Sequence, residues 1–447
     1  MNVLDRLYWR RYERQYDVAS VAATLDDFRR RTPGDARRLL AARLRDQLRR
    51  FAARPDALPA WRDAARIDDL EALWEAWPSL PILTKADLRE RFPARALRAQ
   101  GVEGQFSATG GSTGEPTTFI HDTASVRRMN AVMHVARQAL GWRPGMPTIC
   151  VWGAQRDIGQ GLTGYRRLRH ELTNRLSRLS EVDGFALTEE TARRVHDQLL
   201  ASGGGAAIYG FTSMLDHVAR VVQERGWRVP AGLVRVAWNG GEMLHDEQVT
   251  RFREVFRVPI LNYYGGRELG TIAAQHEAGG PLHLVRPYVF VELIDDAGAA
   301  VAPGQPGRVI VTSTEGRGSP FLRYDIGDVA TCSPDAVDAS GVTRLDALLG
   351  RAGSVLRLPN GATVSNNYWN HLFKELDEVA QFQVRLRPDG SLRLNFVGQP
   401  FAESREAWLR NVLGAFLGPM PIEIAWVDAI PPTRLGKRLQ VVVEDRP

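Results

Sequence analysis

The sequence predicts an α/β protein with a large N-terminal domain of several subdomains, mostly parallel sheets plus a β region, and a small C-terminal α+β domain. Between residues 148 and 265, apolar β-rich runs alternate with helical patterns, which is typical of a parallel sheet covered by helices. Near residue 281 the pattern changes to short strands with Gly and Pro turns, which indicates antiparallel β structure. The length of 447 residues, about three times a typical domain, leaves room for both domains.

Residues 1–78 are predicted to be mainly helical. Apolar residues recur at steps of three and four between Leu40 and Phe51, which indicates a helix with one buried face. In the segment 80–93 a helix is expected to begin after Thr84. Asp87 follows three residues later, as in a capping box.

The central region is predicted to alternate between buried strands and helices. The strands are expected at 148–152, 205–211, 234–239 and 259–265. The helices are expected at 191–200, 214–226 and 246–256. Loops at the carboxyl ends of parallel strands bind ligands in such sheets, so the segments after these strands are candidates for a site.

The domain boundary is predicted near Gly350. Residues 1–349 would form the N-terminal domain, which begins with a basic helical segment at 1–78, and residues 350–447 would form the small domain. In the small domain we expect helices at 367–378 and 403–416, and strands at 379–387, 391–397, 422–427 and 437–444.

The basic charge is concentrated at the N-terminus. The chain has a net charge of +6, and residues 1–55 hold 14 Arg against 7 Asp and Glu, so the remainder is close to neutral. A basic helix can bind nucleic acid, but no aromatic–basic stripe or zinc-finger spacing accompanies this one, so we expect no nucleic-acid partner. A solvated helix face, on which Arg stems cover apolar neighbours, explains the excess better.

The cysteine count and the hydropathy bear on where the protein works. Cys150 and Cys332 cannot form a disulfide framework or a zinc cluster, and their scarcity fits a reducing cytoplasm. No apolar run approaches the roughly 18 residues of a membrane span, and the N-terminus lacks the apolar core of a signal peptide. We therefore expect a cytoplasmic protein without a membrane span.

A run of Gly, Ser and Thr at 107–116 is the strongest local motif. Glycines allow a backbone to approach a ligand closely, and hydroxyl and amide groups can donate to phosphate oxygens. The run lacks the GxxxxGK[ST] pattern of nucleoside triphosphatases. By itself, a run of Gly, Ser and Thr is more often a flexible turn. Polar segments at 240–242 and 264–268 follow two predicted strands, and Asp328 follows a later turn, where its carboxylate suits two ribose hydroxyls.

Lysine is rare in this chain, with three lysines against 55 arginines. An ammonium is a compact point charge, whereas a guanidinium is a broad planar fork, so a remaining lysine can do what arginine cannot. Lys437 lies on a predicted turn near the end of the chain, at Pro432–Lys437. Lys374 lies on a predicted helix, where we expect no special role.

Taken in order, these segments resemble the adenylate-forming superfamily of acyl-CoA synthetases, peptide-synthetase adenylation domains and luciferases, and more narrowly its phenylacetate–CoA ligase-like branch. The matching segments are TGGSTGEP (phosphate loop), YGGRE (the YGxxE segment), FLRYDIGD (the RYxxGD segment), GRAGSVLRLPNGATV (the domain boundary) and TRLGK (the terminal lysine loop). LPILTKADLRERFP resembles an N-terminal signature of the branch. The resemblance runs from about residue 80 to residue 440.

The resemblance implies the residues that hold the nucleotide. The ATP β- and γ-phosphates would be held by Thr109, Ser112, Thr113 and Gly114. The adenine would be flanked by Gly240, Gly241 and Glu242, with Tyr264 stacked on it.

The remaining implied residues concern the metal, the ribose and the chemistry. Glu268 would ligate Mg²⁺, and Asp328 would bind the ribose hydroxyls. Arg351 would contact the nucleotide near a hinge. Lys437 would bridge the acid carboxylate and the α-phosphate during adenylation.

Three segments depart from the family pattern. Glu115 stands where many relatives carry Lys, and Arg267 stands where Thr or Ser is common. Gly353-Ser354 replaces acidic residues at the domain boundary, so the identity of the hinge residue stays open, although Gly353 still permits rotation.

The function implied by the resemblance is that of an AMP-forming acid–thiol ligase. It would activate a carboxylic acid with ATP and Mg²⁺ as an acyl-adenylate, release pyrophosphate, and transfer the acyl group to coenzyme A. A mobile C-terminal domain would present Lys437 in one orientation and help to form the thiol channel in another.

The acid is expected to be aromatic. Tyr209, Phe211 and Trp238 lie near the ends of predicted strands and would line its pocket, although such residues are more often simply core. No cationic residue marks a second charge on the acid.

Two alternatives stay open. The acceptor could be the phosphopantetheine of an acidic carrier protein, docked on basic residues 1–55, or an amine. The chain could also be a non-catalytic nucleotide-binding homologue. The sequence leaves open whether the protein is a homodimer.

Overall fold

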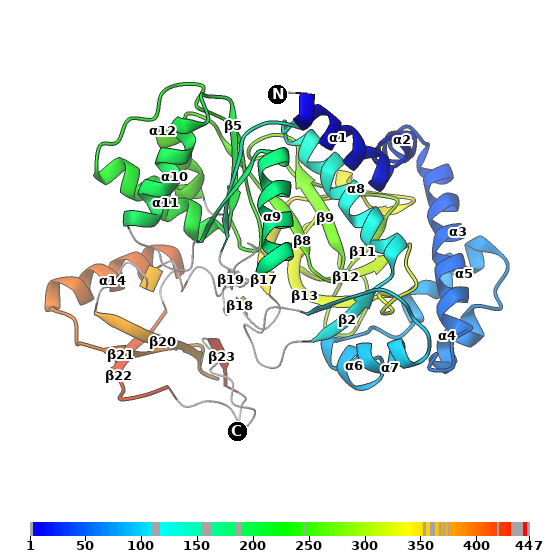
Figure 1. Ribbon diagram of the computed structural model, residues 1–447. Helices are drawn as coiled ribbons and strands as arrows, with labels where there is room; N and C mark the ends of the chain where they lie inside the picture. Colours follow the sequence, from blue (N-terminus) through cyan, green and yellow to red (C-terminus); the bar gives the residue numbers. More distant parts are fainter. Residues whose placement is uncertain are drawn as a thin grey trace.

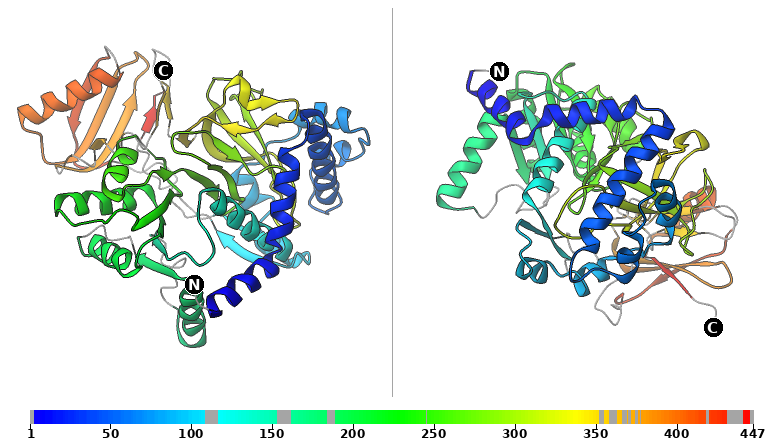
Figure 2. Two further views of the ribbon diagram at one scale, coloured as in Figure 1. Left: turned by 90° about the horizontal axis from the view of Figure 1, so that it is seen from above. Right: turned by 90° about the vertical axis from the view of Figure 1, so that its right-hand side faces the viewer.

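The computed structural model places an N-terminal group of helices, a central region of sheets, and a C-terminal unit that lies to one side (Figure 1 and Figure 2). It describes residues 3–108, 117–152, 162–183, 189–244, 246–351, 355–357, 363–365, 369, 372–373, 376, 378–417, 420–430 and 441–444. At 213, 351, 355–357, 363–365, 380, 412 and 415–416 it describes the backbone alone.

The chain begins with seven helices, in agreement with the predicted helical segment. They are α1 (Val3–Tyr16), α2 (Val18–Arg29), α3 (Pro33–Ala52), α4 (Pro59–Ala64), α5 (Leu70–Ala76), α6 (Lys85–Glu90) and α7 (Ala94–Ala99), with the 3₁₀ turn η1 at Trp77–Ser79. The long helix α3 buries Leu40, Leu44, Leu48 and Phe51, which confirms the predicted apolar face.

The predicted capping box opens α6. The Thr84 hydroxyl accepts a hydrogen bond from the Asp87 backbone N–H, and the Asp87 carboxylate accepts one from the Thr84 backbone N–H at 2.9 Å. The helix therefore begins where the sequence predicted, because two backbone donors that its first turn leaves unpaired are satisfied.

The central sheet has five parallel strands in the order β4-β3-β5-β6-β7. Its strands are β3 (Thr148–Trp152), β4 (Leu179–Asp183), β5 (Ala206–Gly210), β6 (Val234–Asn239) and β7 (Ile260–Leu261). The predicted parallel sheet is thus confirmed, but β4 and the preceding helix α9 (Gly164–Ser177) were not predicted. Helix α9 buries none of its residues. Its apolar residues Tyr165, Leu168 and Leu172 recur at helical spacing but are exposed.

Helices cover both faces of this sheet. One face packs on α10 (Glu189–Ala201), α11 (Thr212–Glu224) and α12 (Asp246–Phe256), close to the predicted ranges, and the shared core includes Ile208 and Val218. The other face packs on α8 (Thr123–Ala139) through a cluster that contains Ala136, Val236 and Trp238.

The predicted strand at 259–265 is in fact two strands in two sheets, so this prediction was wrong. The chain leaves the parallel sheet after β7 and enters an antiparallel sheet as β8 (Tyr263–Gly266). A run of apolar residues looks the same in either sheet, so the switch has no signal in the pattern. It brings the start of β8 next to the carboxyl end of β6.

Antiparallel strands form the β region, as predicted. One sheet has the order β16-β10-β9-β8, with β9 at Gly270–Gln275, β10 at Leu282–Leu284 and β16 at Arg344–Leu345. Another has the order β11-β12-β13-β17, with β11 at Val289–Ile294, β12 at Gly307–Ser313, β13 at Tyr324–Thr331 and β17 at Ala347–Arg351. Small pairs are β1 (Gln105–Ala108) with β2 (Thr118–His121), β14 (Val337–Asp338) with β15 (Gly341–Val342), and β18 (Val355–Arg357) with β19 (Thr363–Ser365); the 3₁₀ turn η2 lies at Pro334–Ala336.

The C-terminal unit has a sheet and a core of its own. Its strands β20 (Val379–Leu386), β21 (Leu392–Gly398), β22 (Ile422–Trp426) and β23 (Val441–Val443) pair in the order β22-β21-β20-β23, and α14 (Glu403–Leu417) packs beside them. These elements match the predicted ranges closely, and their buried residues form one cluster that includes Phe396 and Leu409. The cluster explains why the unit stands apart in Figure 2 (left).

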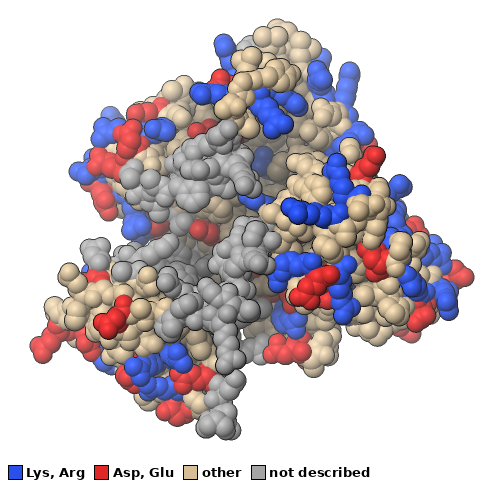
Figure 3. All heavy atoms as spheres, turned by 60° about the horizontal axis from the view of Figure 1, so that its bottom comes forward, with Lys and Arg blue, Asp and Glu red and all other residues tan. Residues whose placement is uncertain are grey.

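The arginines of the N-terminal helices bind partners within the chain. Arg54 pairs with Asp56 at 2.8 Å and lies over the Phe51 ring, and Arg37 pairs with Glu71. Figure 3 shows basic and acidic side chains interspersed on the face that it draws. These contacts support the interpretation of the basic excess as a solvated helical surface. In the part of the chain that the structure describes, no helix is long and apolar enough to cross a membrane.

Candidate active site

The carboxyl end of β6 is the centre of the candidate site. Asn239, the last residue of this strand, is fully buried, and its Oδ1 accepts a hydrogen bond from the Tyr263 backbone N–H at 3.1 Å. Its Nδ2 donates to the Thr212 hydroxyl and to the Glu242 carbonyl oxygen, both at 2.9 Å. One amide thereby joins β6, β8, α11 and the Gly240–Glu242 turn. Sequence reasoning missed Asn239, because a lone Asn before two glycines is also an ordinary turn residue.

Two aromatic rings pack against the glycine pair that follows Asn239. Gly241 has φ +72°, and a Cβ there would lie 2.5 Å from the Phe211 ring, so neither the backbone nor the space admits a side chain. Gly240 faces the Trp152 ring. The two rings stack on each other with centroids 4.1 Å apart. Glu242 is exposed, and its carbonyl rather than its carboxylate makes the bonds given above.

Two residues predicted to contact the nucleotide are in direct contact. The Tyr264 hydroxyl donates a hydrogen bond of 2.9 Å to Oδ2 of Asp328, although the two residues are 64 positions apart. Tyr264 is buried and Asp328 is partly exposed. The turn before Asp328 is held by Asp325, which accepts from the Gly327 N–H at 2.9 Å and pairs with Arg308 at 2.6 Å.

Glu268 lies near the same place and is buried at 7% exposure. The Tyr324 hydroxyl donates a long hydrogen bond of 3.4 Å to its Oε1, and a Cβ at Gly266 would lie 3.2 Å from its Oε2. Among the described residues, no group of three or more His, Cys, Asp and Glu side chains could hold a metal ion. Mg²⁺ usually needs only one or two protein carboxylates when phosphates supply further ligands, so a single Glu268 fits this ion when ATP is bound.

The β1–β2 hairpin connects Glu268 to both ends of the predicted phosphate segment. Ala108 and Thr118 are partners in the hairpin, so the chain leaves and re-enters it at one place. The exposed Arg267 donates to the Ala108 carbonyl at 3.1 Å, and its own carbonyl oxygen lies 3.0 Å from Nε2 of His121. The segment that carries Glu268 is thus tied to the strands on both sides of residues 109–116.

His121 is a buried neutral donor in this arrangement. A carbonyl oxygen can only accept, so Nε2 of His121 carries the proton that the Arg267 carbonyl binds. Burial lowers the pKa of His121 below its ordinary value, against the hydrogen bond to Arg267, which raises it. His121 therefore acts as a positioning residue for the peptide that precedes Glu268. Sequence reasoning did not identify it.

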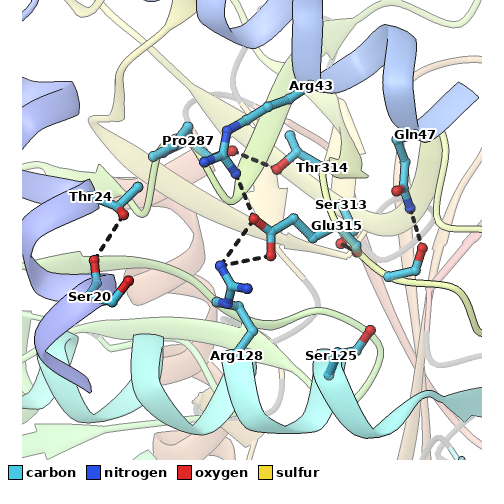
Figure 4. A network of polar contacts seen from close by, with 12 residues as sticks. Ser20, Thr24, Arg43, Gln47, Ser125, Arg128, Pro287, Ser313, Thr314 and Glu315 are labelled. Atoms are coloured by element: carbon cyan, nitrogen blue, oxygen red, sulfur yellow. Dashed lines mark hydrogen bonds and ion pairs between the residues drawn. The ribbon is translucent and has the colours of Figure 1, made fainter. Parts of the chain in front are cut away.

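The loop after β12 is held by side chains of helices α3 and α8. Glu315 pairs with Arg43 at 2.7 Å and with Arg128 at 2.9 Å, and Gln47 donates to the Gly316 carbonyl at 3.0 Å (Figure 4). A cavity of about 50 Å³ lies among these residues and Glu268. It has room for water but not for a nucleotide.

Two of the residues predicted to line an acid pocket stack on each other. Tyr209 and Trp238 stack with centroids 4.9 Å apart and an interplanar angle of 2°. Both lie one residue before the end of their strands, beside the glycine pair. Phe211 follows β5 and packs on Gly241, as described above.

Several predicted residues lie outside the described part of the chain. They are Thr109, Ser112, Thr113, Gly114 and Lys437. Of Arg351 the structure describes the backbone, which is paired directly with Asp328 between β17 and β13.

Comparison with known proteins agrees with this arrangement. The phenylacetate–coenzyme A ligase of Thermus thermophilus is 24% identical over 326 residues, which cover 71% of this chain and 70% of that protein. This similarity agrees with the resemblance of the sequence to the phenylacetate–CoA ligase-like branch of the adenylate-forming superfamily. No family model matches the chain.

Several solved structures share the fold of this chain. A 2-hydroxyisobutyryl-CoA ligase in its postadenylation state superposes with a TM-score of 0.63 at 17% identity, covering 92% of this chain and 90% of that one. An open conformation of the same ligase with its acyl-adenylate and CoA gives 0.61 at 18% identity, covering 92% of each chain. A structure from work on fatty acyl-adenylate ligases of E. coli and L. pneumophila gives 0.51 at 18% identity, covering 75% of this chain and 68% of that one.

Proposed function

We propose that the chain is an AMP-forming acid–thiol ligase. It activates a carboxylic acid with ATP as an acyl-adenylate, with release of pyrophosphate, and then transfers the acyl group to the thiol of coenzyme A, with release of AMP. The relatives named above as coenzyme A ligases support the reaction class.

One observation carries the proposal: the hydrogen bond between Tyr264 and Asp328. It joins the YGGRE and YDIGD segments, which come from different sheets, in the place where Asn239 also brings the Gly240–Glu242 turn. Three segments that would contact adenine, ribose and metal are therefore adjacent. A protein without a nucleotide site has no evident reason to bring these three segments together.

The nucleotide would lie with its ribose at Asp328 and its adenine at Tyr264 and the glycine pair. The Asp328 carboxylate can accept from two ribose hydroxyls, and the Tyr264 hydroxyl bond fixes its orientation. Thr109, Ser112, Thr113 and Gly114 would then donate to the β- and γ-phosphates.

The chemistry consists of two displacements. In the first, an oxygen of the acid carboxylate attacks the α-phosphorus, and pyrophosphate leaves. In the second, the thiolate sulfur attacks the acyl carbon, and AMP leaves. Bound Mg²⁺, held at Glu268, would neutralise phosphate charge. Lys437 would lie between carboxylate and α-phosphate and lower their repulsion, since a fixed cation stabilises charge that develops in the transition state.

The small domain, 350–447, would carry Lys437 to the site and away from it. The backbone pair of Asp328 and Arg351 supports a boundary beside the residue that we propose binds the ribose. Rotation about this boundary would thus exchange Lys437 for the thiol channel without moving Asp328.

The test is a panel of carboxylic acids, each incubated with ATP and Mg²⁺ and then with coenzyme A. We expect acid-dependent exchange of pyrophosphate into ATP, an acyl-adenylate by mass spectrometry, and an acyl-CoA after addition of the thiol. If the acyl group is transferred only to a phosphopantetheinylated carrier protein or to an amine, that molecule is the acceptor in place of coenzyme A. ATP binding without exchange for any acid would contradict the proposal and favour a non-catalytic homologue.

A further inference from the structure

An arginine that the sequence did not single out lies against the aromatic cluster. The guanidinium carbon of Arg137, on α8, lies 5.0 Å from the centroid of the Tyr209 ring and 5.6 Å from that of the Trp238 ring. Arg137 and Tyr209 both keep intermediate exposure, although they are packed between α8 and the central sheet. A cation therefore faces the rings that would line the acid pocket.

The groups around Arg137 are uncharged. Its guanidinium interacts electrostatically with the phenols of Tyr12, Tyr209 and Tyr263, the thiol of Cys150 and the imidazole of His134. Burial and the charge of Arg137 lower the pKa of His134 to about 4, so this imidazole is neutral near pH 7. Burial raises the pKa of each of these three tyrosines above its ordinary value, so none supplies a negative charge near pH 7. The Tyr263 hydroxyl is also hydrogen-bonded to the Thr271 hydroxyl.

Among the described residues, no carboxylate is paired with Arg137. Its Nε is buried and has no hydrogen-bond partner in that part of the chain. Glu181, which interacts electrostatically with Tyr209, is bound to His170 at 2.7 Å and to Asn174 at 2.9 Å instead.

A second arginine of helix α8 lies over a ring and also pairs with a carboxylate. Arg128 also lies over an aromatic ring, with its guanidinium carbon 5.2 Å from the Tyr288 centroid, but it pairs in addition with Glu315 at 2.9 Å. Figure 4 shows this pair closed by Arg43 on the other side. Arg128 thus has both a ring and a carboxylate, whereas Arg137 has two rings and no described carboxylate.

A partly buried cation without an anion is unfavourable, and aromatic faces offset only part of the cost. A guanidinium that stacks with its plane on a ring keeps the N–H donors at its edge, which match a carboxylate in two parallel hydrogen bonds. An anionic oxygen group of a ligand could pair with Arg137 as the Glu315 carboxylate pairs with Arg128.

We propose that Arg137 binds a second carboxylate of the acid substrate, so that the preferred substrates are dicarboxylic acids whose hydrocarbon part packs on Tyr209 and Trp238. This inference rests on the proposed ligase function. Position supports it: Tyr263 and Tyr264 are consecutive in β8, and successive side chains of a strand point to opposite faces. Tyr264 bonds Asp328 on the nucleotide side, and Tyr263 interacts with Arg137 on the other.

The test compares acids that differ by one carboxylate. Phenylacetate is compared with 3- and 4-carboxyphenylacetate, and butyrate with glutarate, by pyrophosphate exchange under initial-rate conditions. We expect the wild-type protein to show a kcat/KM at least about tenfold higher for the better dicarboxylate of a pair, because charge-assisted hydrogen bonds discriminate on this scale. Arg137→Met should lower this ratio at least about tenfold, and Arg137→Lys should keep part of it.

Arg127→Met is the matched control, because Arg127 is exposed on the same helix and donates to the Gln15 carbonyl at 2.9 Å. It should leave the ratio as in the wild-type protein. Should Arg137→Met fail to fold, the wild-type ratios and Arg137→Lys decide. A wild-type protein that prefers monocarboxylates, or an unchanged ratio in folded Arg137→Met, overturns the role of Arg137 and leaves the ligase function standing. Absence of adenylate with every acid overturns both.

Discussion

The two sides of the candidate site are held together by different forces. On the side where we propose that the nucleotide binds (the nucleotide side), Tyr264, Asp328 and Asn239 make directed hydrogen bonds of 2.9–3.1 Å between short segments. On the side where we propose that the acid binds (the acid side), Tyr209 and Trp238 stack as flat rings, and α8 brings a cation against them. Directed bonds suit a ligand whose chemistry does not vary, whereas packed rings can accept different acids with small changes of shape.

This difference leads to different expectations for substitutions. A change on the nucleotide side should lower the rate with every acid by a similar factor. A change on the acid side should alter the ratio of rates between acids. A substitution that violates this pattern would show that the two sides are not separate.

The largest effect is expected for Lys437→Ala. Removal of one fixed charge at a developing anion costs about 3–4 kcal/mol, so pyrophosphate exchange should fall by about two to three orders of magnitude with every acid. ATP affinity, measured by isothermal titration calorimetry, should change little, because the charge acts on the reacting atoms.

Lys374→Ala is the control for this change, since the sequence gives Lys374 no role. It should exchange pyrophosphate at the wild-type rate. Near wild-type exchange in Lys437→Ala would remove Lys437 from the chemistry, and a loss confined to some acids would place it on the acid side.

The next effect concerns the pair of Asp328 and Tyr264. Asp328→Ala removes the carboxylate that would bind the ribose, and hydrogen bonds to a charged group contribute about 1.5–3 kcal/mol, so ATP affinity should fall by about ten- to a hundredfold. Tyr264→Phe keeps the ring and removes one neutral donor, so its loss should stay below about tenfold. Titration with ATP measures both.

The order of these two variants is the informative result. If Tyr264→Phe weakened ATP binding as much as Asp328→Ala, the hydroxyl rather than the carboxylate would bind the nucleotide. Both variants should keep the wild-type ratio of rates between phenylacetate and its carboxylated analogues, because neither lies on the acid side.

Gly241 lies where the two sides meet, so its substitution sharpens the comparison. A Cβ at this position would lie 2.5 Å from the Phe211 ring, and φ is +72°. Gly241→Ala should therefore move the ring and lower the unfolding free energy, with overpacking alone costing about 1–3 kcal/mol. We also expect altered ratios between acids. Urea unfolding and the acid panel measure the two effects.

Gly226→Ala is the matched control for backbone strain. Gly226 has φ +62°, but a Cβ there would meet no atom within 4 Å. The destabilisation of Gly241→Ala beyond that of Gly226→Ala measures the clash with Phe211. Equal destabilisation of the two variants would show that the ring moves at no cost.

The two sides also differ in how well the sequence predicts them. Tyr264, Glu268 and Asp328 stand in short segments whose residue types match their expected chemistry, so they were predicted, and the structure brings them close together. Short polar motifs of this kind can be recognised in a sequence because a nucleotide presents the same donors and acceptors to every protein that binds it. The roles of these residues remain predictions.

The acid side and the connecting residues were predicted less well. Arg137 is one arginine among 55, on a helix that contains no motif, and only the packing of α8 on the sheet brings it to Tyr209. Asn239 and His121 act through the backbone of other segments, which leaves no pattern in their own surroundings. The switch from β7 to β8 was missed for the same reason, because an apolar run does not reveal which sheet it joins.

The smallest effect we predict tests how the phosphate segment is anchored. Asp122 begins α8 and accepts hydrogen bonds from the Ser125 hydroxyl at 2.6 Å and from the Arg317 backbone N–H at 2.5 Å. Burial raises the pKa of Asp122, but these and further hydrogen bonds outweigh it and hold the pKa below its ordinary value. Its carboxylate therefore stabilises the folded state above the unfolded pKa of about 3.9, and this stability is lost as the pH falls through the lower folded pKa.

Asp122→Asn should accordingly lower the urea midpoint at pH 7, by the equivalent of about 1 kcal/mol, and the difference from the wild-type protein should shrink as the pH falls below 4. Asp389→Asn is the control, because Asp389 has a pKa lowered by Ser391 but lies exposed in the β20–β21 turn, where solvent screens the interaction. Its effect should be smaller at every pH. A difference for Asp122→Asn that stays constant from pH 7 to pH 3 would mean that its hydrogen bonds do not depend on the charge. The protonated carboxyl group of Asp122 would then anchor β2 as well as the carboxylate does, so the charge of Asp122 would contribute nothing to this anchor.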